Sequence, residues 1–185
     1  MTSALHLAAA YRALCAGAVV AYPTEAVWGL GCDPHNAHAV ARLLALKRRS
    51  RRKGLILIAA NFEQIAPYLG PLPPARLLQM KASWPGPVTW LVPASKRVPR
   101  WIRGEHDSVA LRVTAHPVAS ALCYVFGAPI VSTSANLSGR EPERSKLRLR
   151  RRLGAGLGCV VPGPLGDLPR PTPIRDALTG KLVRP

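Results

Sequence analysis

Acidic residues are scarce in this chain, because nine Asp and Glu stand against 26 Lys and Arg and give a formal net charge of +17. Such an excess of cations favours a partner that carries phosphates, either a nucleotide or nucleic acid. The apolar content of 48% and the positive mean hydropathy exclude a disordered chain despite this charge. At 185 residues the chain can bury its own core, and we expect residues 1–185 to form a single domain.

Metal-ligand spacing and long apolar runs are also missing. Cys15, Cys32, Cys123 and Cys159 form no C-x-x-C pair and have no His at ligand spacing. The sequence therefore predicts no zinc site, and four buried or half-buried thiols in a reducing compartment. No apolar run reaches the roughly 18 residues of a membrane span. Since the N-terminus lacks a basic signal-peptide start and Arg12 interrupts it, we expect a soluble cytoplasmic protein.

Helical and strand patterns alternate along the chain, which predicts an α/β domain with a mixed sheet and no internal repeat. The expected strands cover residues 18–22, 55–59, 88–92, 108–113 and 129–133, with a final β-hairpin turning near Thr179 and Gly180. The expected helices begin at Thr2 or Ser3, at Asn36, at Asn61, after the Pro-rich 70–75 and at Thr114; Gly17 and Gly127 end the first and the last. Asn61 and Gln64 resemble a capping box.

The basic residues gather in two runs. "KRRSRRKG" (47–54) begins on the last turn of the helix expected from Asn36 and leads directly into the apolar "LILIAA" of 55–60. Cations at that position also interact favourably with the helix dipole. Composition alone leaves open whether the run is a solvated or nucleic-acid-binding surface or is held by the strand against a smaller polyanion. The second run, 146–152, lies in the one candidate linker, 139–153, on an expected exposed helix or loop.

A glycine-rich stretch, "YPTEAVWGLGCD" (22–33), leaves an expected strand and places Thr24, Glu25, Gly29 and Gly31 in a tight loop. Glycines there permit close approach of the backbone to a ligand, although simple chain reversal explains them equally well. Pro34 blocks a dinucleotide fingerprint, and no G-x-x-x-x-G-K-[ST] sequence occurs in the chain. If the protein binds ATP, it does so without a Walker loop.

Two further stretches carry polar groups on expected strands. "SWPGPVTW" (83–90) stiffens the entrance of a strand with prolines and presents Thr89, which suits either a binding edge or stability. "IVSTSANLSG" (130–139) follows a buried strand with five hydroxyl and amide side chains: Ser132, Thr133, Ser134, Asn136 and Ser138. Local turn and cap bonds account for two of the five. Open α/β sheets bind ligands at such carboxyl ends of strands.

Together these stretches resemble one family. The segments "PTEAVWGLGCD", "LKRRSRRKGLILIAAN", "WPGPVTW", "SVALRV", "VSTSANLSG" and "IRDALTG" occur in the order found in the YrdC/Sua5 family of threonylcarbamoyl-AMP synthases. The resemblance covers nearly the whole chain and points to the short bacterial form, without the extra C-terminal domain. It implies the YrdC-like fold, a twisted mixed sheet with flanking helices and a basic concave surface.

The resemblance also implies an ATP-dependent nucleotidyltransferase that converts L-threonine, bicarbonate or CO2, and ATP with Mg2+ into threonylcarbamoyl-adenylate and pyrophosphate. A downstream threonylcarbamoyl-transferase complex then modifies position 37 of tRNAs that read codons beginning with A. Attack of a carbamate on the α-phosphorus needs positioning and cations more than a covalent nucleophile. We expect tRNA or double-stranded RNA at the basic surface, no metal held by the protein alone and no membrane partner.

Site residues follow from the resemblance by motif position. The K-x-R element, Lys47 and Arg49, is the implied catalytic pair. The implied ATP contacts are Lys47, Arg49, Lys53, Pro85, Ser134, Asn136 and Arg184. The implied threonine contacts are Thr24, Ile58, Thr89, Arg112, Ser132 and Thr172, with Arg112 pairing the carboxylate or the carbamate. The chain departs from the common pattern at Ala26, Ser50 and Gly54 and in "PTPIRD", and none of these departures removes a cation.

Two other functions stay open. An RNA-binding module without catalysis needs only the charge and a basic concave sheet. Against it, the few aromatic residues do not alternate with basic ones, so stacking platforms are poorly supplied. The related carbamoyl-adenylate domain of hydrogenase maturation would use carbamoyl phosphate and ignore threonine, but its usual acylphosphatase and zinc-finger neighbours are absent from this chain.

Overall fold

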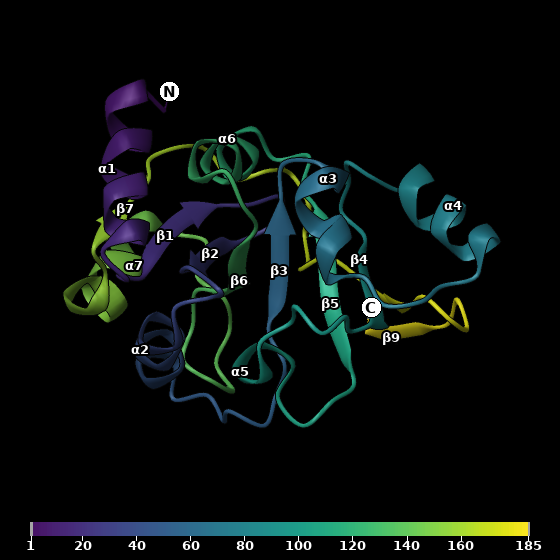
Figure 1. Cartoon of the computed structure of the whole chain (residues 1–185). Helices are drawn as coiled ribbons and strands as arrows, with labels where there is room; N and C mark the ends of the chain where they lie inside the picture. The colour runs from purple at the N-terminus through teal and green to yellow at the C-terminus, as the bar shows by residue number, and fades with distance from the viewer. Residues whose placement is uncertain (1, 185) are drawn as a thin grey trace.

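A single nine-stranded mixed sheet with helices on both faces forms the protein in the computed structural model, which describes residues 2–184 (Figure 1). The helices are α1 (Ala4–Cys15), α2 (Ala37–Lys47), α3 (Phe62–Ile65), α4 (Pro74–Ala82), α5 (Arg100–Arg103), α6 (Pro117–Phe126) and α7 (Lys146–Leu153), with short 3-10 turns at Ala66–Tyr68 and Gly154–Gly156. The strands are β1 (Val20–Pro23), β2 (Trp28–Gly31), β3 (Ile56–Ala59), β4 (Thr89–Pro93), β5 (Ser108–Val113), β6 (Ile130–Ser134), β7 (Cys159–Val160), β8 (Ile174–Asp176) and β9 (Leu182–Arg184).

The strand order is β7-β1-β2-β6-β3-β5-β4-β8-β9. The pairs β1/β7, β3/β5 and β4/β8 are parallel, and the other neighbours are antiparallel. The predicted α/β fold with a mixed sheet is therefore confirmed. The strands expected from the sequence lie within two residues of β1, β3, β4, β5 and β6, whereas β2, β7 and α5 were not predicted.

Side chains cap the first three helices at the residues that the sequence indicates. Ser3 caps α1, Asn36 caps α2, and Asn61 caps α3 by accepting the backbone N–H of Gln64 at 3.0 Å. The expected capping box of α3 forms only in part, because Gln64 Oε1 accepts the N–H of Ala60 and not that of Asn61. The final hairpin is also as predicted, with β8 and β9 joined through a turn that contains Gly180 at a φ of 74°.

The glycine-rich stretch 22–33 forms a β-hairpin, which corrects the prediction of a loop. Gly29 and Gly31 lie on β2, and β2 pairs with β1 on one side and β6 on the other. A Cβ at Gly31 would lie 2.5 Å from the carbonyl oxygen of Val131, so glycine permits the close approach of these strands. The strand was missed because β2 is buried on both faces, and its four residues show no apolar–polar alternation.

The start of α6 differs from the prediction. The helix begins at Pro117 with His116 as its cap, three residues after Thr114, the expected opener. The hydroxyl of Thr114 instead donates to Glu25 Oε1 at 2.6 Å, far away in the sequence. A tertiary contact has therefore replaced the local cap that the sequence suggested.

Residues 139–153 are not a linker. They contain α7, which buries Leu149 and Leu153 in the core while its basic side chains are exposed or half-buried. The backbone N–H of Glu143 also bonds the carbonyl of Ala135 at 3.2 Å. The basic composition suggested a linker because an amphipathic helix with only two core contacts has few apolar residues.

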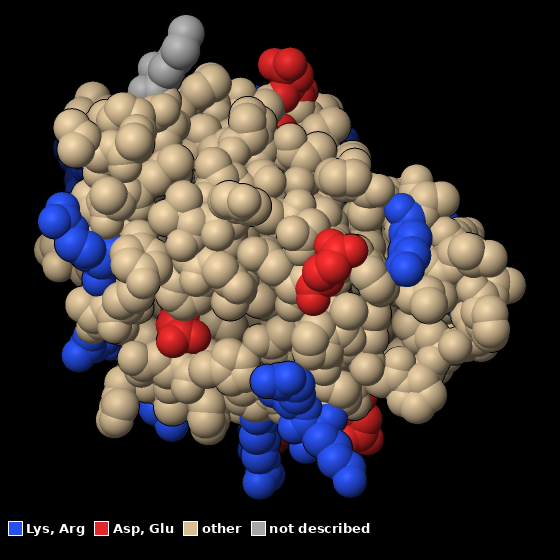
Figure 2. All heavy atoms as spheres, turned by 45° about the horizontal axis from the view of Figure 1, so that its top comes forward, with Lys and Arg blue, Asp and Glu red and all other residues tan. Residues whose placement is uncertain are grey.

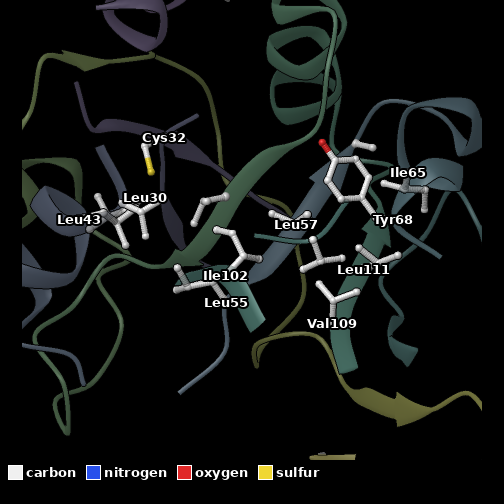
Figure 3. Close-up of a cluster of buried hydrophobic side chains, with 14 of the residues drawn as sticks. Leu30, Cys32, Leu43, Leu55, Leu57, Ile65, Tyr68, Ile102, Val109 and Leu111 are labelled. Atoms are coloured by element: carbon white, nitrogen blue, oxygen red, sulfur yellow. The ribbon is translucent and has the colours of Figure 1, made fainter. Parts of the chain in front are cut away.

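Two apolar clusters occupy opposite faces of the sheet. The larger lies between the sheet and helices α2, α3, α4, α5 and α7, and Figure 3 shows side chains from β2, β3, β5, α2 and α5 meeting there. The smaller lies under α1 and α6 and contains Val20, Tyr22, Ile58 and Ile130. Alternating strand residues therefore supply the two faces. Helices α1 and α6 cover only part of the second face, and a cavity opens beside them at Ile56 and Ser132.

Two thiols are buried as predicted, Cys32 in the larger cluster and Cys123 in the smaller. Burial raises the pKa of each to about 12. Cys159 is half-buried, but Cys15 is exposed at the end of α1, which corrects the prediction for that residue.

Cations are unevenly distributed over the surface. Figure 2, in which the top of the view in Figure 1 comes forward, shows a mostly uncharged face with Lys and Arg side chains mainly near its edges. The basic concave surface that the family resemblance implies is therefore not on this face. None of the helices within residues 2–184 has the length and apolar character needed to cross a membrane.

Candidate active site

A cavity of about 340 Å³ opens on the sheet face that also carries the smaller cluster. Seven of the thirteen residues predicted for the site line it: Thr24, Arg49, Arg112, Ser132, Ser134, Thr172 and Arg184. They come from the β1–β2 turn, the loop after α2, strands β5, β6 and β9, and the segment before β8. The tertiary structure thus brings together residues that span most of the chain.

Strand register explains how the polar side chains meet. Ile58 pairs with Ile130 on β6 and with Arg112 on β5, and Ile56 pairs with Ser132. Register partners point to the same face of a sheet, and residues two apart share that face. At Ile58 and Ile130 helices cover the face, whereas at Ile56 and Ser132 it opens into the cavity. The hydroxyl groups therefore appear where the apolar cover ends.

A buried ion pair lies beside the cavity. Arg112 Nη2 and Glu25 Oε2 are 3.3 Å apart, and both side chains are nearly inaccessible to solvent. Burial alone would raise the pKa of Glu25, but the Arg112 guanidinium and the hydrogen bond from Thr114 outweigh it, so the pKa is lowered. Glu25 is therefore ionised at neutral pH and orients Arg112.

Thr172 joins the last part of the chain to this pair. Arg112 Nη1 donates to Thr172 Oγ1 at 2.9 Å, and Arg184 Nη2 donates to the Thr172 carbonyl at 3.0 Å. Thr89 Oγ1 lies 3.4 Å from Thr172 Oγ1, so the fully buried Thr89 supports Thr172 from behind. These bonds hold residues 170–172 against the open side of the sheet.

The guanidinium groups of the cavity repel one another. Burial and then the charge of Arg184 lower the pKa of Arg49, and burial and then Arg112 lower that of Arg184. Arginine stays protonated under these conditions. Arg49 Nη2 donates to the Gly54 carbonyl at 2.8 Å, whereas its Nε is buried without a partner. An anion in the cavity would relieve this repulsion and bond the free donors.

Lys47, from the same motif as Arg49, does not line the cavity. It is only 2% exposed, and its Nζ donates to the carbonyls of Ser134 and Asn136, the latter at 2.8 Å. Burial, and then the charge of Arg49, lowers the pKa of Lys47 to about 8. Its ammonium group is therefore fully used inside the protein.

Five other predicted residues also do not line the cavity. Lys53 is exposed on the loop after α2, and Pro85 borders two grooves beside α3 and α6. Ile58 is fully buried in the smaller cluster, and Thr89 lies behind Thr172. Asn136 uses its side-chain amide within its own loop.

Several residues at or beside the cavity were not predicted as site residues. Pro142, Arg170 and Pro171 line it together with Trp28, and Glu25 supports Arg112 from beneath. Arg170 is the one charged residue of the Pro-rich segment "PRPTP" (169–173), and this isolated charge could have marked it as a candidate site residue. Nothing local to Pro142 indicates that its loop returns to the sheet. Within residues 2–184 there is no group of three or more His, Cys, Asp or Glu arranged to hold a metal ion.

Comparison with known proteins adds a family relationship. Residues 12–185 match the Sua5/YciO/YrdC family, whose description reads "Telomere recombination". A threonylcarbamoyl-AMP synthase of Halorhodospira halophila is 62% identical over 91% of this chain and 88% of its own length. A threonylcarbamoyl-AMP synthase of Xanthomonas euvesicatoria is 50% identical over the full length of both chains.

Solved structures agree with the fold. The structure of P. abyssi Sua5 complexed with L-threonine has a TM-score of 0.88 and 33% identity over 98% of this chain, which spans 53% of that longer protein. E. coli YciO has a TM-score of 0.86 and 26% identity over 96% of this chain and 87% of its own. Full-length HypF shares the fold at a TM-score of 0.80 with 17% identity, over 92% of this chain and 27% of HypF.

Proposed function

This chain belongs to the Sua5/YciO/YrdC family, and we propose that it is a threonylcarbamoyl-AMP synthase. It forms threonylcarbamoyl-adenylate and pyrophosphate from L-threonine, bicarbonate or CO2, and ATP. The identities of 62% and 50% with synthases of that name support the assignment. The alternatives of a carbamoyl-adenylate domain and of a noncatalytic RNA-binding module have no comparable support.

The observation that carries the proposal is the convergence of guanidinium groups in one cavity. Arg49, Arg112, Arg170 and Arg184 meet there, and the buried carboxylate of Glu25 beside them is already paired with Arg112. A cavity of about 340 Å³ with this charge suits a polyanion with a small polar co-substrate. Arginine forks suit the oxygens of phosphate and carboxylate groups.

The proposed chemistry needs these residues to hold and orient charges. The carbamate of threonine attacks the α-phosphorus of ATP, a P–O bond forms, and the bond to pyrophosphate breaks. Arg49 and Arg184 bind the phosphate oxygens and stabilise the charge that develops on them. Mg2+ would be held by the phosphates of the nucleotide, because within residues 2–184 the one acidic side chain beside the cavity, Glu25, already pairs with Arg112.

Threonine binds, in this proposal, at the hydroxyl-lined end of the cavity. Thr24, Ser132 and Thr172 surround Arg112 there. Arg112 lines this part of the cavity, and its guanidinium can donate to the carboxylate or the carbamate. Because Glu25 pairs with Nη2 and Thr172 accepts from Nη1, the guanidinium is oriented before the substrate arrives.

Product analysis tests the function directly. The purified protein is incubated with Mg-ATP, L-threonine and isotopically labelled bicarbonate, and the products are identified by mass spectrometry. We expect labelled threonylcarbamoyl-adenylate that requires threonine and falls about a hundredfold in Arg49→Ala. Arg51→Ala, an exposed cation two residues away, is the matched control and should stay within about twofold of wild type.

Two outcomes would overturn the assignment. A labelled carbamoyl-adenylate formed from carbamoyl phosphate without threonine would favour the carbamoyl-adenylate alternative. Absence of any adenylate product, with RNA binding retained at low salt, would favour the RNA-binding module.

The partners and setting extend the same proposal. We propose that residues 1–185 act as one cytoplasmic domain, that its product passes to a threonylcarbamoyl-transferase complex, and that tRNA is attracted to the exposed cations of α7. Support for the last point comes from the outward face of that helix, where Arg148, Arg151 and Arg152 line a shallow hollow of about 340 Å³. Its inward leucines, Leu149 and Leu153, are buried, so its exposed side chains are the basic ones together with Leu147.

A further inference from the structure

The two short motifs of the site divide their residues in the same way. In K-x-R, Arg49 lines the cavity and Lys47 does not; in S-x-N, Ser134 lines the cavity and Asn136 does not. The middle residues of the two motifs, Arg48 and Ala135, have structural roles. Arg48 adopts a left-handed conformation with a φ of 51° at the end of α2, and Ala135 is fully buried. Each motif therefore sends one functional side chain to the cavity and one beneath it.

The two inward residues bond to each other and to one loop. Lys47 Nζ donates to the carbonyl of Ser134, to the carbonyl of Asn136 at 2.8 Å and to Asn136 Oδ1 at 3.4 Å. An ammonium group has three N–H donors, so these acceptors use all of them. The carbonyl of Lys47 in turn accepts the N–H of Ser138 at 2.8 Å. Both polar ends of the lysine thus hold loop 134–138.

Asn136 completes the arrangement. Its Oδ1 accepts Ser134 Oγ–H at 2.5 Å, and its Nδ2 donates to the carbonyls of Leu137 at 2.9 Å and Arg140 at 2.6 Å. The amide group therefore has no donor left for a nucleotide. The bond to Asn136 uses the hydroxyl hydrogen of Ser134, so the oxygen of this cavity-lining residue is left as an acceptor.

We propose that Lys47 and Asn136 are positioning residues, which form a brace beneath loop 134–138 and present Ser134 and the neighbouring Arg49 to the nucleotide without touching it. The brace corrects a simple reading in which every residue of both motifs contacts ATP. The expected effect of the brace on nucleotide binding rests on the proposed function, whereas its effect on the loop does not.

Comparison of ATP with AMP separates positioning from phosphate contact. A residue that contacts the β- or γ-phosphate contributes to ATP affinity and not to AMP affinity, whereas a loop that presents the whole site contributes to both. Affinities are measured by calorimetry for wild type, Lys47→Met, Asn136→Ala and Arg49→Ala. Met retains the length of the lysine stem and leaves no buried charge unpaired. Asn136→Ala weakens the brace from its other end, and it carries the test if Lys47→Met does not fold.

We expect Lys47→Met to lower the affinities for ATP and for AMP equally, each by about tenfold, because hydrogen bonds from a charged donor to the loop are lost. Asn136→Ala should act in the same direction with a smaller factor, and Arg49→Ala should reduce the ratio of ATP to AMP affinity. Equal losses in the brace variants support the proposal. A fall in the ATP to AMP ratio for Lys47→Met that matches Arg49→Ala would overturn it.

Hydrogen exchange of the nucleotide-free protein gives an independent readout. In Lys47→Met the amides of residues 134–140 should exchange faster than in wild type, while those of β3 and β5 keep their exchange rates. In Arg49→Ala the exchange rates of residues 134–140 should not change. Unchanged exchange in Lys47→Met would overturn the brace. If wild type binds neither nucleotide, the proposed function fails, and the exchange experiment still decides whether the brace exists.

Discussion

The two basic runs of this chain have similar composition and opposite surroundings. In residues 47–53, Lys47 is buried against loop 134–138 and Arg49 lines the cavity, so two of its cations are fixed by the fold. In α7, which contains residues 146–152, the buried residues are Leu149 and Leu153, and none of the cations is buried. The difference teaches that a cation becomes part of a site only where the chain before and after it is held by packing.

The same contrast extends to ion pairs. Glu25 and Arg112 are buried together, whereas Arg52 and Glu105 form a pair at 3.1 Å with both side chains more than half exposed. Breaking a buried pair leaves an uncompensated charge, whereas an exposed pair is worth little. The following predictions test this contrast in order of decreasing effect on stability.

Glu25→Gln should have the largest effect. It leaves Arg112 buried without its carboxylate, and we expect the free energy of unfolding at pH 7 to fall by about 3 to 5 kcal/mol. The lowered pKa of Glu25 means that its contribution is present above the unfolded value of 4.5 and is lost as the pH falls through the folded pKa. Urea unfolding between pH 7 and pH 3 should therefore give a flatter profile in the variant.

Glu105→Gln is the matched control for that change, since it removes the carboxylate of an exposed arginine pair. Its effect should stay below about 0.5 kcal/mol. Equal losses in the two variants would refute the contrast between the pairs.

Lys47→Met should come next, with a loss of about 2 kcal/mol, because buried acceptors of loop 134–138 lose their donor. The folded pKa of Lys47, about 8, lies below its unfolded value of 10.5. The folded state then binds fewer protons than the unfolded state between these values, so wild-type stability gains from rising pH in that window. Unfolding at pH 7 and pH 9.5 should show a gap between wild type and variant that widens with pH.

Arg51→Met, from the same basic run but exposed, should show neither effect. A gap that is constant or narrows with pH would contradict the assigned titration of Lys47.

Arg48→Gly should have a smaller effect of opposite sign. Arg48 ends α2 in a left-handed conformation, with a φ of 51°, which glycine adopts without strain. We expect a gain of about 0.5 to 1 kcal/mol in thermal or urea unfolding. Product formation should stay near wild type, because Arg48 is not among the residues that line the cavity. A loss of product formation would assign Arg48 a role in the site.

Substitution of the cations of α7 should have the smallest effect on the free energy of unfolding and the largest effect on RNA affinity. Arg148→Gln/Arg151→Gln should change the free energy of unfolding by less than about 0.5 kcal/mol. If both arginines contact tRNA phosphates, the slope of log affinity against log salt should become shallower by about 2. Lys146→Gln/Arg150→Gln, on the flank of the same helix, is the charge-matched control and should change the slope less. Equal changes in both variants would show that net charge alone matters.

Much of the site was accessible from the sequence. The serine-rich strand end at 132–134 and the cationic run beginning at Lys47 were recognisable because unusual side chains follow apolar segments that must be buried. Thr172, by contrast, has the local appearance of a turn residue. Its role depends on bonds to Arg112, which is distant in the sequence, and to Arg184 on β9, and neither bond is visible in the local sequence.

The sequence by itself determined the α/β class, most element positions, three helix caps and the family, because periodicity, capping side chains and motif order are local properties. Only the tertiary structure decided that β2 completes a hairpin, that α7 packs on the core, and that Lys47 and Asn136 turn inward while Arg49 and Ser134 face the cavity. The direction of a side chain depends on register and on neighbours far along the chain, and neither is encoded in the spacing of a short motif.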